Sequence, residues 1–423
     1  MIISGRYLGN ENFLGDIEIA NGEIVALTPR ALEPEEHTFG PSTVLRERIA
    51  DEHVHIRAQR LKRKARWSDF AANAFQGGVG AVMDMPNNNP PTLTLDDVAL
   101  RRNLASAYVQ HTDIFTHVMV TPRTKPFGEF YHYKLFVAES SGGQGFSSEN
   151  DLRRALDLYS GCHIMFHCED PSILAANTRA PLHEDRRPRE AEVSAIGSVL
   201  DLCQEYGIHA TIAHVSTMKG LRMILDAKPK FETLGLRLRS QVVYHHLLLN
   251  RENLASGTIE VFGQNYELEH ARLIRMNPPI REESDQTYLM QRLIQGDIDA
   301  VASDDAPHTL AEKQSSSPPS GVTILPFEAQ AAELLHSFGV TNDILTHVTH
   351  DSPMQYMTRD WHYKSDLYEG RSAKFIVVDR NKGAIADKDV PGKPHWCYLS
   401  GALMPGKVTH WIDGDNVIPV KIS

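Results

Sequence analysis

Apolar and polar residues alternate along both ends of the chain. Residues 16–20 and 23–27 have the two-residue period of half-buried strands and flank Asn21-Gly22, a pair that supplies the positive φ angles of a tight hairpin turn. The last 60 or so residues alternate in a similar way, with a turn signal at Asp413-Gly414-Asp415. We therefore expect a small β-sandwich domain formed jointly from residues 1–47 and 365–423.

In the middle of the chain, short β-branched apolar runs alternate with longer amphipathic stretches. This pattern is typical of βα units with parallel strands. The eight runs occupy residues 48–55, 79–87, 113–120, 132–138, 163–169, 208–215, 241–249 and 298–304. Helices are expected between them at residues 95–108, 149–159, 189–206, 218–226 and 285–294. The fold class is thus α/β, and the pattern predicts a (β/α)8 barrel over residues 48–364, with reactive groups at the C-terminal ends of its strands.

The composition excludes several classes of protein. Hydrophobic residues make up 41% and charged residues 23% of the 423 residues, which is typical of a folded globular protein. The 43 Lys and Arg residues against 54 Asp and Glu residues leave a net charge of −11, which argues against nucleic acid and anionic lipid as partners. There is no signal-peptide pattern, no membrane-length apolar run and no zinc-finger spacing among the four cysteines. We expect a cytoplasmic protein with reduced thiols.

Chemically reactive residues fall at the ends of the predicted strands. The first run ends His53-Val54-His55, and residues two apart on a strand face the same side, so both imidazoles can bind one cation. Alone, such a pair is more often a chance pattern of partly exposed histidines. Other runs add Lys134, His167, His214 and Asp304. Six such side chains are too many for one tetrahedral ion and suit two Zn²⁺ ions that share a bridge.

Lys134 lies among aromatic and aliphatic neighbours in the fourth run. Two dications would repel an ammonium group, and burial lowers the pKa of a lysine. A neutral amine can add CO₂, and the resulting carbamate would bridge both metals; the alternative is an ordinary lysine paired with a carboxylate. Two cations would lower the pKa of a bridging water from 15.7 to about 7. Hydrolysis is the implied reaction, with Asp304 as a metal ligand that also transfers the proton.

Six motifs, in this order along the chain, carry a family resemblance. They are DEHVHIR at 51–57, DMPN at 84–87, KLF at 134–136, HHLLL at 245–249, MNPPIR at 276–281 and ASDDAPHT at 302–309. With these motifs, over about residues 45–330, the chain resembles the dihydroorotases of the amidohydrolase superfamily. The resemblance implies reversible hydrolysis of (S)-dihydroorotate to N-carbamoyl-L-aspartate in de novo pyrimidine biosynthesis.

The same resemblance implies a role for each matched residue. His53 and His55 would bind the more buried zinc ion and His167 and His214 the other, with carboxylated Lys134 and a hydroxide as bridges. Arg57, Asn87 and His308 would hold the substrate carboxylate, and Asn277 would lie near the ring. Arg57 fits independently, because its planar guanidinium suits a carboxylate and it follows His55 by two residues. The alternative for Arg57 is a surface ion pair with Asp69 or a helix-end carboxylate.

The chain departs from the family pattern at three places. Asp305 stands where His is frequent, Ala58-Gln59-Arg60 replaces Glu-Pro-Gly, and Glu47-Arg48 replaces Pro-Gly. A hydantoinase, dihydropyrimidinase or allantoinase would share the metal chemistry but would not need an arginine for a ring carboxylate. A non-catalytic partner of aspartate transcarbamoylase is a further alternative, against which the complete ligand set argues. We also expect a homodimer, the commonest symmetric oligomer.

Overall fold

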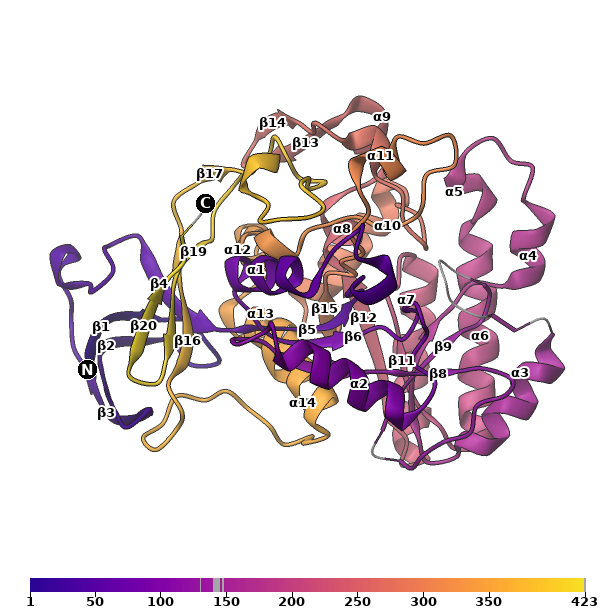
Figure 1. Ribbon diagram of the computed structural model, residues 1–423, viewed down its shortest axis with the longest axis horizontal. Coiled ribbons are helices and arrows are strands. Elements are labelled where there is room, and N and C mark those ends of the chain that lie inside the picture. Colours follow the sequence, from indigo (N-terminus) through magenta and orange to yellow (C-terminus); the bar gives the residue numbers. More distant parts are fainter. Residues whose placement is uncertain (130, 140–144, 147, 422–423) are drawn as a thin grey trace.

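A seven-stranded sheet brings the two ends of the chain together, at the left of Figure 1. The computed structural model describes residues 1–129, 131–139, 145–146 and 148–421. The strands in spatial order are β20 (Asn416–Pro419), β19 (Lys407–Asp413), β16 (Lys374–Asp379), β4 (Thr43–Glu47), β1 (Ile2–Tyr7), β2 (Phe13–Ala20) and β3 (Glu23–Pro29). Because β16 pairs antiparallel with both β4 and β19, the C-terminal strands extend the N-terminal ones.

The predicted N-terminal hairpin is present. β2 and β3 pair antiparallel around Asn21 (φ 55°) and Gly22 (φ 83°), whose left-handed angles are those of a type I′ turn. Ile17 and Ile24 pack with Phe375, from the other end of the chain, in a hydrophobic core of their own. The expectation that both ends share one β structure is confirmed. The strand pairing shows a single sheet here and does not divide it into two layers.

Each of the eight predicted apolar runs overlaps a strand. These strands are β5 (Ile49–Val54), β6 (Val79–Asp84), β7 (Asp113–Thr116) with β8 (Val118–Val120), β9 (His132–Phe136), β10 (His163–His167), β11 (His209–Ile212), β12 (Leu238–Val243) and β15 (Ala300–Ala302). Neighbouring strands pair in parallel, and their spatial order follows their order along the chain. The predicted parallel βα architecture is confirmed.

The parallel strands form two sheets instead of the closed ring that we expected. β5 to β7 make a three-stranded sheet, and β8 to β12 with β15 make a six-stranded one. One seam falls at His117, between β7 and β8, and the other lies between β15 and β5. A single parallel bridge from Val54 to Asp305 crosses the second seam, with a 2.8 Å hydrogen bond from the His55 N–H to the Asp305 carbonyl. The ladder is interrupted there because β15 has only three residues and Asp304 (φ 47°) turns the chain away.

Helices lie around the parallel sheets (Figure 1). They are α1 (Trp67–Gly77), α2 (Leu95–Ser106), α3 (Glu149–Leu156), α4 (Pro171–Ala176), α5 (His183–Arg186), α6 (Arg189–Tyr206), α7 (Met218–Thr233), α8 (Tyr244–Leu248), α9 (Arg251–Ser256), α10 (Glu283–Ile294), α11 (Leu310–Lys313), α12 (Glu328–Ser337), α13 (Asn342–Thr346) and α14 (Ser352–Thr358). Two small hairpins pair β13 (Thr258–Val261) with β14 (Gln264–Glu267) and β17 (Gly383–Ala384) with β18 (Leu403–Met404). Within the described ranges, none of the helices has both the length and the apolar composition that crossing a bilayer requires.

The five predicted helices are present as α2, α3, α6, α7 and α10. One predicted strand is wrong in its second half. The apolar run at 241–249 leaves the sheet at Val243 and continues as α8. A short apolar run has no period that distinguishes a buried strand from a buried helix, so only the packing of the folded chain decides between them.

Candidate metal centre and active site

A cavity lies at the C-terminal ends of the parallel strands. The predicted site residues that line it are His53, His55, Arg57, Asn87, His167, His214, Asn277 and Asp304. The other two predicted residues, Lys134 and His308, are buried but do not line it. The fold therefore brings residues that are far apart along the chain to one place, at the edge of the sheets where the chemistry was expected.

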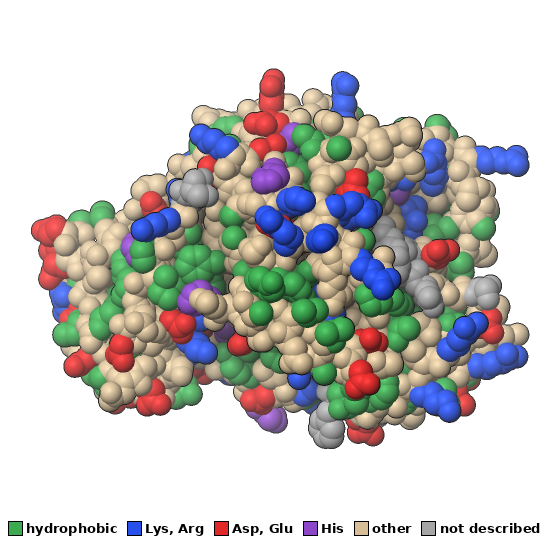
Figure 2. Space-filling model, viewed as in Figure 1, with side chains coloured by type: hydrophobic (Ala, Val, Ile, Leu, Met, Phe, Trp, Pro, Cys, Tyr) green, Lys and Arg blue, Asp and Glu red, His purple; other side chains and the backbone are tan. Residues whose placement is uncertain are grey.

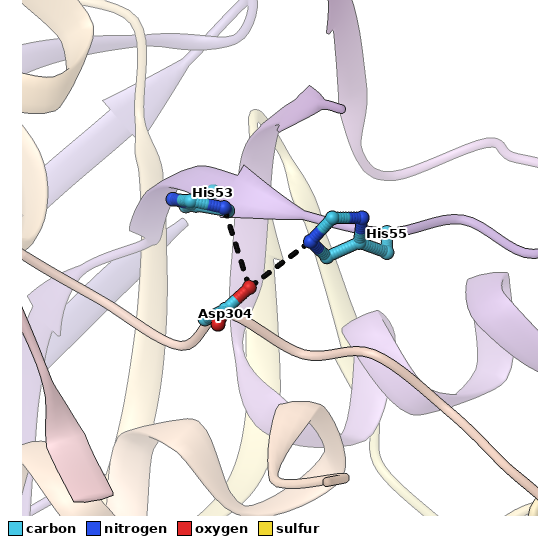
Figure 3. Close-up of side chains that lie close together, drawn as sticks. All are labelled: His53, His55 and Asp304. Atoms are coloured by element: carbon cyan, nitrogen blue, oxygen red, sulfur yellow. Dashed lines mark hydrogen bonds and ion pairs between the residues drawn. The ribbon is translucent and has the colours of Figure 1, made fainter. Parts of the chain in front are cut away.

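His53, His55 and Asp304 form a compact group of candidate metal ligands (Figure 3). The Asp304 Oδ1 atom lies 3.3 Å from Nε2 of His53 and 3.0 Å from Nε2 of His55. None of these side chains is more than 10% exposed. Two imidazoles and a carboxylate are ligands that Zn²⁺ binds in catalytic sites.

Two amide side chains orient these imidazoles. Nδ1 of His53 lies 2.8 Å from Oε1 of Gln241, and Nδ1 of His55 lies 2.8 Å from Oδ1 of Asn87. Because an amide oxygen only accepts hydrogen bonds, each Nδ1 carries the hydrogen and each Nε2 keeps its lone pair on the Asp304 side. Binding of a metal through Nε2 requires this tautomer. Asn87 therefore contacts a candidate ligand, a role that the sequence did not indicate.

His167 and His214 form a second pair of imidazoles in the cavity. Nδ1 of His167 lies 2.9 Å from Nε2 of His214, and Nε2 of His167 donates a 2.8 Å hydrogen bond to Glu169. Arg187 also pairs with Glu169. Although burial opposes it, the charge of Arg187 and the hydrogen bond from His167 lower the pKa of Glu169 to about 2. Glu169 thus stays ionised and directs Nδ1 of His167 toward His214.

Lys134, on β9, is completely buried. Burial lowers the pKa of its amine to about 7, although the charges of Asp304 and Cys168 act in the opposite direction. No described residue accepts a hydrogen bond from its Nζ, which lies 5.3 Å from the centre of the Phe136 ring. The ordinary alternative, a lysine paired with a carboxylate, is therefore not what the described residues show.

The donor set fits a divalent cation. Burial lowers the pKa of His53, His55, His167 and His214, so that the imidazoles are neutral, as metal binding requires. Nδ1 of His214 and Nζ of Lys134 are buried polar atoms without a hydrogen-bond partner among the described residues. Such atoms cost free energy in a folded protein, and they are commonly explained by a group that is bound at the site.

Asp51 links the segment that carries His53 with the segment that carries Asp304. Its Oδ1 atom accepts hydrogen bonds from the backbone N–H groups of His53, at 2.9 Å, and Ser303, at 3.3 Å. The Ser303 hydroxyl donates to the other oxygen of Asp51. Asp304 follows directly with a φ of 47°, and His214 has a φ of 39°. Two candidate ligands thus adopt left-handed backbone angles, which cost about 1–3 kcal/mol each and concentrate at functional sites.

Arg57 is a buried cation that forms no ion pair within the described ranges. It is 4% exposed, and its Nη1 atom donates a 3.4 Å hydrogen bond to the carbonyl of Asn87. Among the described residues, no carboxylate forms an ion pair with it and its Nε atom has no partner. The alternative of a surface ion pair with Asp69 is wrong, because Asp69 binds Arg66 at 2.9 Å. A buried guanidinium that lines a cavity and forms no ion pair among the described residues, although the charge of Asp304 acts on it, favours an anionic ligand.

The remaining predicted residues lie near a loop that follows β15. Asn277 accepts a 2.9 Å hydrogen bond from the hydroxyl of Ser320, and His308 lies 2.9 Å from Nζ of Lys64. Asp305, the departure from the family pattern, accepts backbone hydrogen bonds from Ile324 and Leu325 at 2.8 and 3.1 Å. Asp305 therefore holds the backbone of this loop and does not line the cavity.

Sequence reasoning missed Gln241, Glu169 and Lys64. Gln241 begins the seventh apolar run, and Glu169 follows His167 by two residues, so each lies where a strand end was expected. The positions of Gln241 and Glu169 in predicted strands could have indicated a role at the site, but only the folded structure shows which imidazole each side chain contacts. Lys64 belongs to a run of basic residues in which nothing distinguishes it from its neighbours.

Glu328, at the start of α12, is a completely buried carboxyl whose two oxygens lack hydrogen-bond partners among the described residues. Burial, together with the charges of Asp51 and Asp305, raises its pKa well above the usual range, although the neighbouring Tyr244 hydroxyl acts in the opposite direction. A raised pKa means that the folded chain loses stability as the pH rises from the unfolded pKa through the folded one. We expect Glu328→Gln to raise the free energy of unfolding at pH 8 by about 1–3 kcal/mol and to change it little at pH 5, as measured by urea denaturation of the metal-free chain.

The matched control is Glu333→Gln, which removes a buried carboxylate that pairs with Arg46 and Arg380. This variant is expected to lower the free energy of unfolding at both pH values. A loss of stability at pH 8 in Glu328→Gln would contradict the assignment of Glu328 as an unsatisfied carboxyl.

Comparison with solved structures identifies the fold. L-Hydantoinase from Arthrobacter aurescens superimposes with a TM-score of 0.81 at 19% sequence identity, covering 98% of this chain and 95% of that one. Dihydropyrimidinase from Brevibacillus agri superimposes with a TM-score of 0.78 at 17% identity, covering 99% and 95%. These similarities establish the mixed α/β architecture over nearly the whole chain.

Sequence comparison identifies the family. A curated dihydroorotase from Halobacterium salinarum is 30% identical over 395 residues, covering 87% of this chain and 86% of that protein. One from Pyrococcus abyssi is 27% identical over 416 residues, covering 96% and 92%. No family model matches the chain. The fold, the candidate metal site and these relatives define a dihydroorotase-like cyclic amidohydrolase. More particularly, the chain belongs to the dihydroorotase family.

Proposed function

We propose that the chain is a dihydroorotase, which reversibly hydrolyses (S)-dihydroorotate to N-carbamoyl-L-aspartate in de novo pyrimidine biosynthesis. The buried guanidinium of Arg57 carries this proposal, because it lines the cavity beside the candidate metal ligands without an anionic partner among the described residues. Dihydroorotate bears a carboxylate on its ring, whereas the rings of hydantoin and dihydrouracil do not. An uncharged ring would leave this cation buried and unpaired, which is costly.

We propose two Zn²⁺ ions at the site. His53 and His55 would bind one and His167 and His214 the other, while Asp304 would be a ligand and Lys134, carboxylated by CO₂, would bridge them. The buried, unpartnered Nζ of Lys134 and the neutral imidazoles support this assignment. When bound, the two cations would supply Lewis acidity and would lower the pKa of a water molecule toward neutral pH.

Substrate binding and proton transfer are assigned to side chains of the site. The guanidinium of Arg57 would pair with the ring carboxylate and turn the scissile amide toward Asp304. Asp304 is the proposed acid/base: its Oδ2 atom would take a proton from the attacking water and return it to the ring nitrogen as the C–N bond breaks. The water oxygen ends in the new carboxylate, whose remaining proton is released to solvent, and Asp304 ends as it began. Asn277 would lie beside the ring, with its oxygen engaged by Ser320.

Replacing Arg57 with Met tests the proposal. We expect kcat/KM for dihydroorotate to fall about 100-fold or more, because a buried charge pair with the substrate is lost. Metal content, measured by elemental analysis, is expected to stay unchanged, since Arg57 contacts no candidate ligand atom. The matched control is Arg60→Met, an exposed arginine of the same loop, with kinetics close to those of the unmodified protein.

The same assay compares dihydroorotate with dihydrouracil, hydantoin and allantoin on the metal-loaded protein. Preference for an uncharged ring would reject the proposal in favour of a hydantoinase, dihydropyrimidinase or allantoinase. Absence of turnover would favour a non-catalytic partner of aspartate transcarbamoylase. Unaltered kinetics in Arg57→Met would remove the assigned role of Arg57.

We further propose that the two parallel sheets belong to one (β/α)8 barrel domain of residues 48–364, beside a composite β-sandwich domain of residues 1–47 and 365–423. The chain-order arrangement of the parallel strands and the joint sheet of both chain ends support this division. The expected homodimer and the possible association with aspartate transcarbamoylase remain predictions from the sequence.

A further inference from the structure

Lys64 lies in a strongly basic loop at the cavity. Between β5 and α1, residues 57–66 contain Arg57, Arg60, Lys62, Arg63, Lys64 and Arg66, although the whole chain has a net charge of −11. Figure 2 shows Lys and Arg side chains gathered near the centre of this face, where Figure 1 draws α1 and the segment before it. Among these residues, Lys64 is partly buried, and its Nζ atom lies 2.9 Å from Nδ1 of His308.

This contact determines the tautomer of His308. Burial and the charge of Arg57 lower the pKa of Lys64 to about 8, so its amine remains protonated at neutral pH. An ammonium group has donors and no acceptor, so Nδ1 of His308 must accept. Burial, with the charges of Arg57, Lys64 and Lys313, lowers the pKa of His308, which therefore stays neutral. A neutral imidazole that accepts at Nδ1 carries its hydrogen on Nε2.

Nε2 of His308 is buried and has no hydrogen-bond partner of good geometry among the described residues, although the backbone of Ser320 acts to raise the pKa of this imidazole. The ring carbon next to it, Cδ2, faces Gly321, at which a Cβ atom would lie only 3.1 Å away. Gly321 lines the same cavity as Arg57. His308 thus packs against a residue that lines the same cavity as Arg57.

We propose that Lys64 is a positioning residue that holds His308 with its hydrogen on Nε2, so that His308 donates a hydrogen bond to the anionic group that Arg57 pairs with. The ligand class is a ring that carries a carboxylate, and in this respect the inference rests on the proposed function. Without the Lys64 contact, His308 would be free to place its hydrogen on Nδ1 and present a lone pair to the carboxylate.

The first test reads the tautomer directly. ¹⁵N-histidine labelling of the full chain reports which imidazole nitrogen of His308 is protonated, and the signal is assigned by its loss in His308→Gln. We expect a protonated Nε2 in the unmodified protein and in Lys64→Arg, which retains a donor. In Lys64→Met we expect a substantial population protonated on Nδ1. The control is Lys62→Met, an exposed lysine of the same loop, with the tautomer unchanged.

The second test uses kinetics with dihydroorotate. Lys64→Met is expected to raise KM about tenfold, which is the size of one interaction of about 1.4 kcal/mol, and to change kcat less than threefold. In the His308→Gln background, the amide already donates, so Lys64→Met is expected to change KM less than twofold. Lys62→Met is expected to leave KM unchanged.

Two outcomes would overturn the inference. Either the unmodified protein has its hydrogen on Nδ1 of His308, or Lys64→Met raises KM equally in both backgrounds, which would mean that Lys64 contacts the substrate itself. The tautomer measurement needs no substrate, so its result does not depend on dihydroorotase activity. Failure of the unmodified protein to hydrolyse dihydroorotate would reject the proposed function and leave the tautomer result intact.

Discussion

Replacing Asp304 with Asn is expected to lower kcat for dihydroorotate by about 10³-fold. The amide keeps an oxygen at the position of Oδ1, which faces Nε2 of both His53 and His55. It cannot take a proton from water and return it to the ring nitrogen, and the loss of a general acid/base typically costs 10²–10⁴-fold. Steady-state kinetics with metal-loaded protein, beside elemental analysis, measures the effect.

The adjacent carboxyl provides the control for Asp304→Asn. Asp305 is buried, and it accepts hydrogen bonds from the backbone of Ile324 and Leu325 instead of lining the cavity. Asp305→Asn keeps an accepting oxygen, so kcat is expected to stay within about tenfold of the unmodified value. If Asp304→Asn loses rate only in proportion to lost metal, Asp304 is a ligand and not the acid/base. Equal losses in both variants would contradict a special role for Asp304.

Replacing Lys134 with Ala is expected to lower metal occupancy and to reduce kcat by about 10³-fold, because the proposed bridge between the ions is removed. Short carboxylic acids such as acetate and propionate are expected to restore part of both, since they can occupy the space left by the side chain and supply two oxygens. Elemental analysis and turnover, each with and without added acid, measure these effects.

Lys134→Met provides the matched comparison. Methionine fills the buried space of the lysine stem without an amine, so we expect the same loss of metal and rate but no rescue by added acids. Retention of both metals and the full rate in either variant would show that the bridging assignment is wrong. A loss of rate with full metal content would mean that Lys134 positions another group.

The resemblance to dihydroorotases rests on short motifs, several of which lie at or just after the C-terminal end of a parallel strand, as DEHVHIR does at β5, DMPN at β6 and ASDDAPHT at β15. His53 and His55 converge on Asp304 because β5 and β15 end side by side, joined by the bridge from Val54 to Asp305. The chain order of the motifs could be read without a structure, because local residue types specify strand ends and turns. The contacts between motifs could not, since they depend on which strands become neighbours.

The sequence by itself determined the elements and the chemistry of this protein. Periodicity specified most of the strands and helices, Asn21-Gly22 specified a hairpin, and the residue types at the strand ends specified a candidate metal site. These properties are local, because a turn residue or a ligand type acts over a few positions. Only the tertiary structure decided that residues 244–248 leave the sheet as a helix, that two seams interrupt the parallel strands, that Asn87 orients His55 and that Lys64 meets His308. Those outcomes depend on packing between distant segments, and the hydrophobic pattern along the chain does not encode that packing residue by residue.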